Sequence, residues 1–370
     1  MMRPNLDTLV PAYVREFEPY IPSKPDAELM KLYGCTRLLR LNNNENPLGP
    51  PPGAQEVIRR FLPPQGAVYP SGDSYYLRQA IGVFHGVDPD QVLVGNGANE
   101  VIAFVIKAFC GTGDNIITAD KTFAVYEWVA VFSGIEARVI PLKDEGFDDA
   151  AMLAAVDGRT KILFVCNPNN PTGSYWPRER LVAFLDAVGG ERIVVVDEAY
   201  FEFVEKEDFP NGISLLEDYP NLVVFRTFSK MYGLAALRIG YLVGAPDVVD
   251  MIRRTCVVYS VNRIAQEAAL AALADDTGHI QRTREMVRES RVFLCDQMAG
   301  MGLSVIAGEG NYVIVKLPVS DTLAYRKLMR EGIMIRPMTG FRCPNHIRIT
   351  LARMEAMEAF VAALKKILTG

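Results

Sequence analysis

The chain has 370 residues, 49% of them hydrophobic, and its 39 Lys and Arg against 44 Asp and Glu give a formal net charge of −5. Neither sign of charge is gathered into a long block, which argues against a nucleic-acid or anionic-membrane surface and favours an enzyme that acts on small molecules. At roughly 150 residues per domain, this length predicts two domains around a large buried core.

Six cysteines are scattered singly, with no CxxC pair and no histidine at ligand spacing. This pattern predicts neither a disulfide framework nor a metal site, and we expect reduced, mostly buried thiols. The N-terminal stretch carries Asp7 and prolines where a signal peptide needs an unbroken apolar region, and no apolar run approaches the roughly 18 residues of a membrane span. We therefore expect a soluble, cytoplasmic protein.

Residues 1–50 are rich in proline and end in the sequence LNNNENPLGP. This composition favours an extended arm over packed secondary structure, because proline disfavours helical conformation in the residue before it. We expect the arm to pack on another part of the molecule.

Residues 51–260 alternate short apolar runs with helix-length amphipathic stretches. The expected strands cover residues 91–97, 114–120, 136–142, 161–167, 192–198 and 221–227. Continuous Val and Ile runs separated by helical segments predict an α/β domain with a large, doubly wound, mostly parallel sheet.

Residues 261–370 have a different pattern, which predicts a smaller α+β domain. A long helical stretch through residue 298 comes first. It is followed by four expected strands and a closing helix, at residues 302–308, 311–317, 332–338, 346–351 and 354–368.

Four expected strands of the larger domain end in polar or glycine-rich groups. They run into residues 95–100 (GNGANE), residues 167–173 (NPNNPTG), residues 197–200 (DEAY), and Ser229 with Lys230. Ligands of open parallel sheets bind beyond the carboxyl ends of the strands. The sequence therefore predicts that these groups converge on one site.

Each group also has a simpler interpretation. GNGANE lacks the third glycine of a dinucleotide motif and can be a plain strand-to-helix turn, and NPNNPTG can be a rigid loop. Asp197 could hold magnesium in a P-loop ATPase, but the chain has no GxxxxGK[ST] sequence. A lone lysine at a strand end is usually a solvated side chain.

Together the four groups suit one ligand, pyridoxal 5'-phosphate (PLP). Its phosphate suits the helix N-terminus at residues 97–99, reinforced by Ser229 and Arg238, and its aldehyde condenses with the amine of Lys230. Its pyridine nitrogen stays protonated beside Asp197, since a charge pair at about 3 Å and an effective dielectric near 20 is worth on the order of 5 kcal/mol.

Two further residues and one pKa complete this hypothesis. Asn170 and Tyr200 can hydrogen-bond the phenolic oxygen of PLP. Lys230 must act as a base near neutral pH, so desolvation and neighbouring cations such as Arg238 should lower its pKa from the ordinary value near 10.4.

The motifs resemble those of fold-type I aminotransferases of class I and II, and within them the histidinol-phosphate branch. The resemblance covers nearly the whole chain. It is carried by the segments NPNNPTG, VVVDEAYFEF, RTFSKMYGLAALRIGY, EPYIPSKP, NNNENPLGP, YPSGDSYYLRQA, GIMIRPM and HIRIT.

The resemblance implies PLP as the cofactor and a role for each matching residue. Lys230 would bind the aldehyde, Asp197 the pyridine nitrogen, and Asn170 and Tyr200 the phenolic oxygen. The residues that would hold the cofactor phosphate are Ala98, Asn99, Ser229 and Arg238. Phe123 would stack on the pyridine ring.

The resemblance also implies a homodimer whose partner packs against the N-terminal arm. Tyr69 would reach the phosphate of the neighbouring subunit's cofactor. Arg348 would bind the carboxylate of the amino donor, and Tyr20, Arg336 and Arg348 would contact the substrate phosphate. The simpler interpretation of the two arginines is that they are solvated strand ends.

The chain departs from the pattern at three places. Phe123 lies in DKTFAVY where Pro-Thr-Tyr is usual, Ser23 replaces a glycine, and TLARMEAM replaces a Gly-Thr after the arginine strand. The departures at Ser23 and in TLARMEAM concern the part of the site that binds the substrate rather than the cofactor.

The expected activity is a step of histidine biosynthesis, the reversible ping-pong transfer of an amino group from L-histidinol phosphate to 2-oxoglutarate, giving imidazole-acetol phosphate and L-glutamate. The alternatives are an aromatic aminotransferase, a phosphothreonine decarboxylase, or a non-catalytic ligand-binding protein on the same fold.

Overall fold

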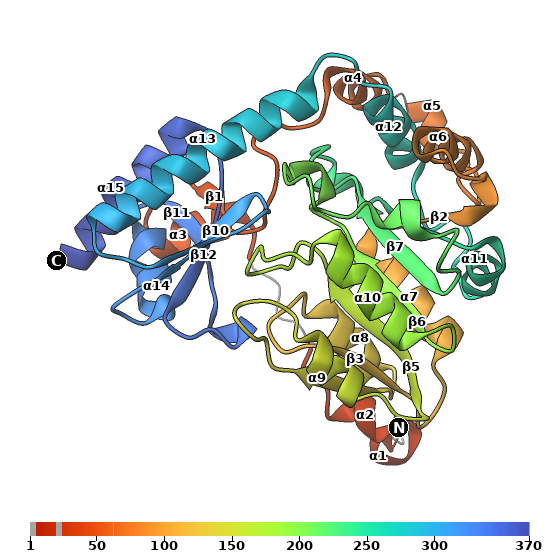
Figure 1. The fold of residues 1–370 in the computed structure, drawn as a ribbon. Coiled ribbons are helices and arrows are strands. Elements are labelled where there is room, and N and C mark those ends of the chain that lie inside the picture. Colours follow the sequence, from red (N-terminus) through yellow and green to blue (C-terminus); the bar gives the residue numbers. More distant parts are fainter. Residues whose placement is uncertain (1–4, 20–23, 62, 370) are drawn as a thin grey trace.

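The computed structural model describes residues 5–19, 24–61 and 63–369. Two sheets organise the molecule, and helices surround both (Figure 1). The larger sheet has seven strands, which are β2 (Val92–Gly95), β3 (Asn115–Ala119), β4 (Glu136–Ile140), β5 (Thr160–Cys166), β6 (Ile193–Asp197), β7 (Leu222–Thr227) and β8 (Gly240–Gly244).

The strand order of the larger sheet is β2-β8-β7-β6-β5-β3-β4, and every strand except β8 runs in the same direction. All six strands expected from the sequence in this region are present. The sequence did not predict β8, a five-residue strand between two glycines that follows the lysine motif directly. It is antiparallel to both β2 and β7.

Helices cover both faces of the larger sheet, as a doubly wound fold requires (Figure 1). The helices that follow its strands are α7 (Ala98–Phe109), α8 (Val125–Phe132), α9 (Asp149–Ala154), α10 (Arg178–Val188) and α11 (Pro246–Arg253). Helix α7 packs against β2, β5, β7 and β8, and α8 packs against β3 and β4. Since Val194, Val195 and Val196 of β6 are fully buried between the two layers, a continuous valine run is what this central strand needs.

The smaller sheet has the order β1-β11-β12-β10-β9, with α13 (His279–Gly300), α14 (Asp321–Arg330) and α15 (Met354–Thr369) beside it (Figure 1). Its strands are β1 (Leu39–Leu41), β9 (Val305–Ala307), β10 (Tyr312–Lys316), β11 (Ile333–Pro337) and β12 (His346–Thr350). The four strands expected after residue 300 and the closing helix are all present. Only β1 joins the sheet in parallel, beside β11.

The N-terminal arm contains more secondary structure than its composition predicted, so the expectation of a plain extended segment was wrong. It forms α1 (Leu6–Leu9), α2 (Ala12–Arg15), α3 (Asp26–Tyr33) and the strand β1. Two of its prolines, Pro11 and Pro25, are N-cap residues of α2 and α3. At that position proline costs nothing, because the residue has no intrahelical N–H bond to lose.

The helical stretch after residue 260 is two helices, α12 (Arg263–Leu273) and α13, separated by a turn at Gly278. Helix α12 packs on α4 (Pro52–Arg60) and α6 (Tyr75–His85), which together with α5 (Pro63–Gly66) follow the arm. The two-domain division stays a prediction. This packing favours a junction near the start of α13 rather than at residue 260.

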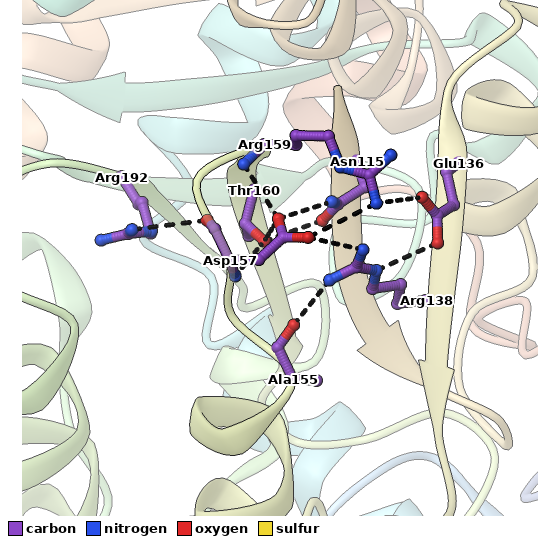
Figure 2. Close-up of polar contacts among 8 residues, drawn as sticks. All are labelled: Asn115, Glu136, Arg138, Ala155, Asp157, Arg159, Thr160 and Arg192. Carbon is purple, nitrogen blue, oxygen red and sulfur yellow. Dashed lines mark hydrogen bonds and ion pairs between the residues drawn. The ribbon is translucent and has the colours of Figure 1, made fainter. Parts of the chain in front are cut away.

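Charged side chains at the amino ends of β3, β4 and β5 bind one another (Figure 2). Asp157 accepts hydrogen bonds from Arg138 Nη2 at 2.7 Å and from the Arg159 amide at 2.9 Å, and Arg138 also pairs with Glu136. Arg138 holds the pKa of Asp157 well below its usual range. Most polar groups of this edge therefore bind one another, although the buried Arg192 Nε has no hydrogen-bond partner among the described residues.

Among the described residues no helix is long and apolar enough to cross a membrane, and no group of three His, Cys, Asp or Glu could hold a metal ion. The six cysteines are free. Only Cys166 is fully buried and the other five are half-buried, so the expectation of mostly buried thiols was wrong.

Candidate active site

A cavity of about 370 Å³ lies beyond the carboxyl ends of β2, β5, β6 and β7. The four polar groups that the sequence predicted to converge do so here. The cavity is lined by Ala98, Asn99, Phe123, Asn170, Asp197, Tyr200, Ser229, Lys230 and Arg238, together with Asn43, Glu45, Cys166 and Thr227.

The N-terminus of α7 forms one wall of the cavity. Gly97 is its N-cap, with a φ of 82°, and a Cβ at this position would collide with Arg238 Nη2. The positive φ favours glycine, and a larger residue would push the guanidinium away from the helix N-terminus. The free amides of the first helical turn and Arg238 together form a site for an anion.

Lys230 follows β7 and points its amine into the cavity, where Nζ donates to the Asn43 carbonyl at 2.8 Å. Burial lowers the pKa of Lys230 to about 7, with Arg348, Arg238 and Arg336 acting in the same direction and Glu45 opposing them. The lowered pKa expected from the sequence is confirmed, although Arg348 contributes more than Arg238.

Asp197 ends β6 and is buried in the cavity wall. Its Oδ2 accepts a hydrogen bond from the Tyr126 hydroxyl at 2.5 Å, and its Oδ1 accepts from the Ala199 amide at 3.1 Å. Burial raises the pKa of Asp197, and these hydrogen bonds oppose the rise. A cation in the cavity would hold the carboxylate ionised.

Tyr126 was not predicted from the sequence. It lies on α8, three residues after Phe123, and the two rings meet edge to face at 5.6 Å. The signal was available, because Tyr126 is only three residues after Phe123, in the turn that leads into α8, where its amide donates to the Phe123 carbonyl. A hydroxyl one turn after Phe123 can reach behind the cavity that Phe123 lines.

The acceptor oxygens of Asn170 and Tyr200 are occupied, and their donors have no hydrogen-bond partner in the described part of the chain. Asn170 Oδ1 accepts from Arg348 Nη1 at 2.5 Å, and the Tyr200 hydroxyl accepts from Asn44 Nδ2 at 2.8 Å. Burial raises the pKa of Tyr200 to about 12, so its proton is retained. Both side chains can therefore donate to one acceptor oxygen in the cavity.

The asparagine-rich segment 42–46 covers the site, a role that the sequence did not reveal. The Asn46 side chain donates to the Met231 carbonyl at 2.7 Å, next to Lys230, and the Asn44 amide donates to Thr350 Oγ1 at 2.9 Å. This segment thereby connects the lysine loop to β12.

Arg336 and Arg348 occupy opposed positions on β11 and β12 and line a larger cavity, about 1020 Å³, that shares Lys230 with the first. Arg348 is 4% exposed, its Nη2 donates to the Asn42 carbonyl at 2.9 Å, and its Nε has no hydrogen-bond partner among the described residues. Arg336 Nη2 donates to Asn43 Oδ1 at 2.6 Å. The interpretation of these arginines as solvated strand ends was therefore wrong.

One predicted residue of the described part of the chain lies outside these cavities. Tyr69 is 81% exposed and packs on the ring of Tyr259 with centroids 4.9 Å apart. Tyr20 lies outside the described residues.

Comparison with known proteins agrees with this geometry. Residues 36–364 match the aminotransferase class I and II family. The chain belongs to this family. The aminotransferase is 38% identical to a histidinol-phosphate aminotransferase of Anaeromyxobacter sp. over 97% of this chain and 99% of the relative. It is 39% identical to histidinol-phosphate aminotransferase 2 of Pseudomonas fluorescens over 96% of each chain.

Solved structures show the same fold. The histidinol-phosphate aminotransferase of Sinorhizobium meliloti, determined in complex with PLP, has a TM-score of 0.86, 28% identity and 97% coverage of each chain. A Thermus thermophilus aspartate aminotransferase with maleate has a TM-score of 0.82 at 24% identity and covers 98% of this chain and all of its own. The fold-type I architecture expected from the sequence is confirmed.

The aminotransferase uses PLP, and the residues present fit this cofactor. The cavity offers a buried acid that a cation would keep ionised, an amine with a pKa of about 7, and a helix N-terminus closed by a guanidinium. These groups match the pyridine nitrogen, the aldehyde and the phosphate respectively.

Proposed function

We propose that this aminotransferase transfers the amino group of L-histidinol phosphate to 2-oxoglutarate in histidine biosynthesis. The observation that carries the proposal is the pair Arg336 and Arg348 on the substrate side of Lys230. A guanidinium binds phosphate and carboxylate through parallel N–H groups, so one pair can serve a phosphorylated amine and a dicarboxylic acid in turn. The names of the full-length relatives support the same substrate.

We assign Lys230 as the group that moves the proton. At neutral pH about half of its amines are neutral, given a pKa of about 7, so Nζ could take the proton from the substrate α-carbon and pass it to the carbon of the PLP aldehyde, on the other side of the transferred nitrogen. PLP, when bound, supplies the aldehyde that takes up the amino group and the ring that accepts electrons. Asp197 holds the pyridine nitrogen protonated, Asn170 and Tyr200 donate to the phenolic oxygen, and Phe123 covers the ring.

The remaining cofactor contacts follow from the N-terminus of α7. Ala98 and Asn99 present its first amides, and Ser229 and Arg238 line the same end of the cavity. We propose that these four residues hold the phosphate of PLP. Arg348 binds the donor carboxylate, and Arg336, Arg348 and Tyr20 bind the substrate phosphate.

We also propose a cytoplasmic homodimer in which Tyr69 contacts the partner's cofactor phosphate. An exposed apolar surface around Tyr69 supports this arrangement, since a contiguous patch of this kind marks an interaction site. Tyr69 packs on the exposed ring of Tyr259, and Val258, also exposed, lies with Tyr259 beside Gly72.

The test is to incubate the protein with L-glutamate and imidazole-acetol phosphate and to measure 2-oxoglutarate. We expect 2-oxoglutarate and histidinol phosphate to form in equal amounts. Formation of 2-oxoglutarate only with aromatic keto acids would indicate the aromatic aminotransferase, and release of carbon dioxide from phosphothreonine would indicate the decarboxylase.

An arginine variant tests the phosphate site. Arg336→Gln should weaken the reaction of histidinol phosphate far more than that of unphosphorylated L-histidinol. Equal losses for the two substrates would contradict the assignment of Arg336.

A further inference from the structure

The loop between β11 and β12 reaches from the smaller sheet to the larger one through Arg342. Its Nη1 donates to the Asp120 carbonyl, just after β3, at 2.9 Å. Its Nη2 donates to both carboxylate oxygens of Glu127 on α8, at 2.8 and 3.0 Å. The tip of the loop is thus held by three hydrogen bonds to the part of the molecule that contains the cofactor cavity.

The base of the same loop is also fixed. Asp321, which is 1% exposed, accepts hydrogen bonds from the amides of Met338 and Thr339 at 2.8 and 2.7 Å and from the Thr339 hydroxyl at 2.7 Å. The short helix η5 (Thr339–Phe341) lies between this anchor and Arg342. The position of Phe341 is therefore determined from both sides.

Phe341 lines the substrate cavity, so the contacts that fix the loop also fix this part of the cavity wall. The Arg348 guanidinium carbon lies 5.7 Å from the centroid of the Phe341 ring and 5.4 Å from that of Tyr312. Contacts at such distances are weakly attractive, and two rings beside one guanidinium restrict its orientation. Tyr312 is fixed on β10 by its own hydroxyl, which donates to the Asn169 carbonyl at 2.6 Å. Phe341 is the ring that depends on the loop.

We propose that Arg342 is a positioning residue for the substrate: by binding Glu127 and Asp120 it holds Phe341 beside Arg348 and so sets the affinity for the anionic group bound there. The proposal rests on the proposed role of Arg348. Arg342 itself is directed away from Arg348, toward α8, and has no part in proton transfer.

The size of the effect follows from the exposure of the contacts. The Arg342 and Glu127 side chains are 45% and 29% exposed, so their ion pair is weakened by solvent, and the bond to the carbonyl contributes about as much as the pair. Together they correspond to a change of about tenfold in an equilibrium constant.

The kinetic test uses Arg342→Ala in the full-length, PLP-loaded enzyme. We expect the KM for histidinol phosphate and for 2-oxoglutarate to rise about tenfold while kcat stays within about threefold. Glu127→Gln should give part of this increase, and the exchange Glu127→Arg with Arg342→Glu should restore part of it. Arg254→Ala is the matched control, since it breaks an exposed ion pair with Asp250 on α11.

A second measurement does not depend on the reaction. Trp128 lines a pocket together with Phe341 and Arg342, whereas Trp176, the other tryptophan, is 2% exposed. Acrylamide should therefore quench Trp128 more strongly in Arg342→Ala than in the parent and leave Arg254→Ala unchanged. Trp128→Phe should remove the difference.

The two measurements separate the outcomes. An unchanged KM would overturn the proposal, and so would a raised KM without a change in quenching, because the effect would then not pass through the loop. If the parent does not act on histidinol phosphate at all, the proposed function fails, while the quenching result still decides whether Arg342 holds the loop. Circular dichroism of each variant confirms that the fold is retained.

Discussion

The pKa of Lys230 gives the sharpest quantitative prediction. Its lowering from 10.5 to about 7 corresponds to roughly 5 kcal/mol in favour of the neutral amine, at 1.36 kcal/mol per pKa unit. At pH 7 about half of the Lys230 amines should be neutral, against roughly one in 2500 for an ordinary lysine. At pH 7 Lys230 should therefore react with an electrophile about a thousandfold faster than a surface lysine whose neutral amine has the same reactivity.

The assay is trace labelling of the PLP-free, full-length protein with acetic anhydride between pH 5.5 and 10, followed by mass spectrometry of the peptide that carries Lys230. Labelling of Lys230 should rise with a midpoint near pH 7, and surface lysines of the same digest provide the internal reference. A midpoint near 10 would refute the argument that burial and the surrounding arginines lower the pKa.

The variant Arg348→Leu separates the effect of a neighbouring charge on the pKa of Lys230 from the effect of burial. Arg348→Leu removes the cation that contributes most, so the midpoint should rise above that of the parent. Arg254→Leu, on α11, is the control and should leave the midpoint in place. A midpoint that stays near 7 in Arg348→Leu would contradict a contribution from Arg348 and leave burial, with Arg238 and Arg336, as the cause of the shift.

Three further substitutions test the walls of the site and the sheet that carries it. Tyr126→Phe removes a hydrogen bond to the buried carboxylate at the end of β6, so PLP should bind about tenfold more weakly in a spectrophotometric titration; an unchanged Kd would contradict this. Gly97→Ala would place a methyl group against Arg238 Nη2 and displace the guanidinium, and the Kd for PLP should rise more than tenfold in a folded protein. Arg226→Met leaves Glu198 buried without its 2.6 Å ion pair and should cost about 3 to 5 kcal/mol in urea unfolding, a loss that Glu198→Leu in the same chain should largely reverse.

The sequence predicted the edge of the sheet where the site lies because that prediction needs only strand direction. Parallel strands bring their carboxyl ends together, so Asp197 and Lys230 had to meet once their strands were identified. The six valine- and isoleucine-rich strands were recognisable because both faces of the sheet are covered. The strand β8 was not, since it begins and ends in glycine and only three hydrophobic residues lie between the two.

The contacts across the site could not be predicted in the same way. Asn44 and Tyr200 are 156 residues apart, and Asn44 and Thr350 are 306 apart, so no local pattern joins them. From the sequence alone, Arg336 and Arg348 cannot be told from ordinary solvated residues at strand ends. Only the antiparallel register of β11 and β12 shows that they lie opposite each other. In the arm, prolines indicated an irregular chain, but Pro25 in fact begins a helix.

The most direct test of the account is to identify the lysine that binds PLP. Borohydride reduction of the PLP-loaded enzyme, followed by digestion and mass spectrometry, should place the cofactor on Lys230, and Lys230→Ala should lose both the label and the yellow absorption of the bound cofactor. A label on another lysine, or a visible absorption band that persists in Lys230→Ala, would contradict the central claim.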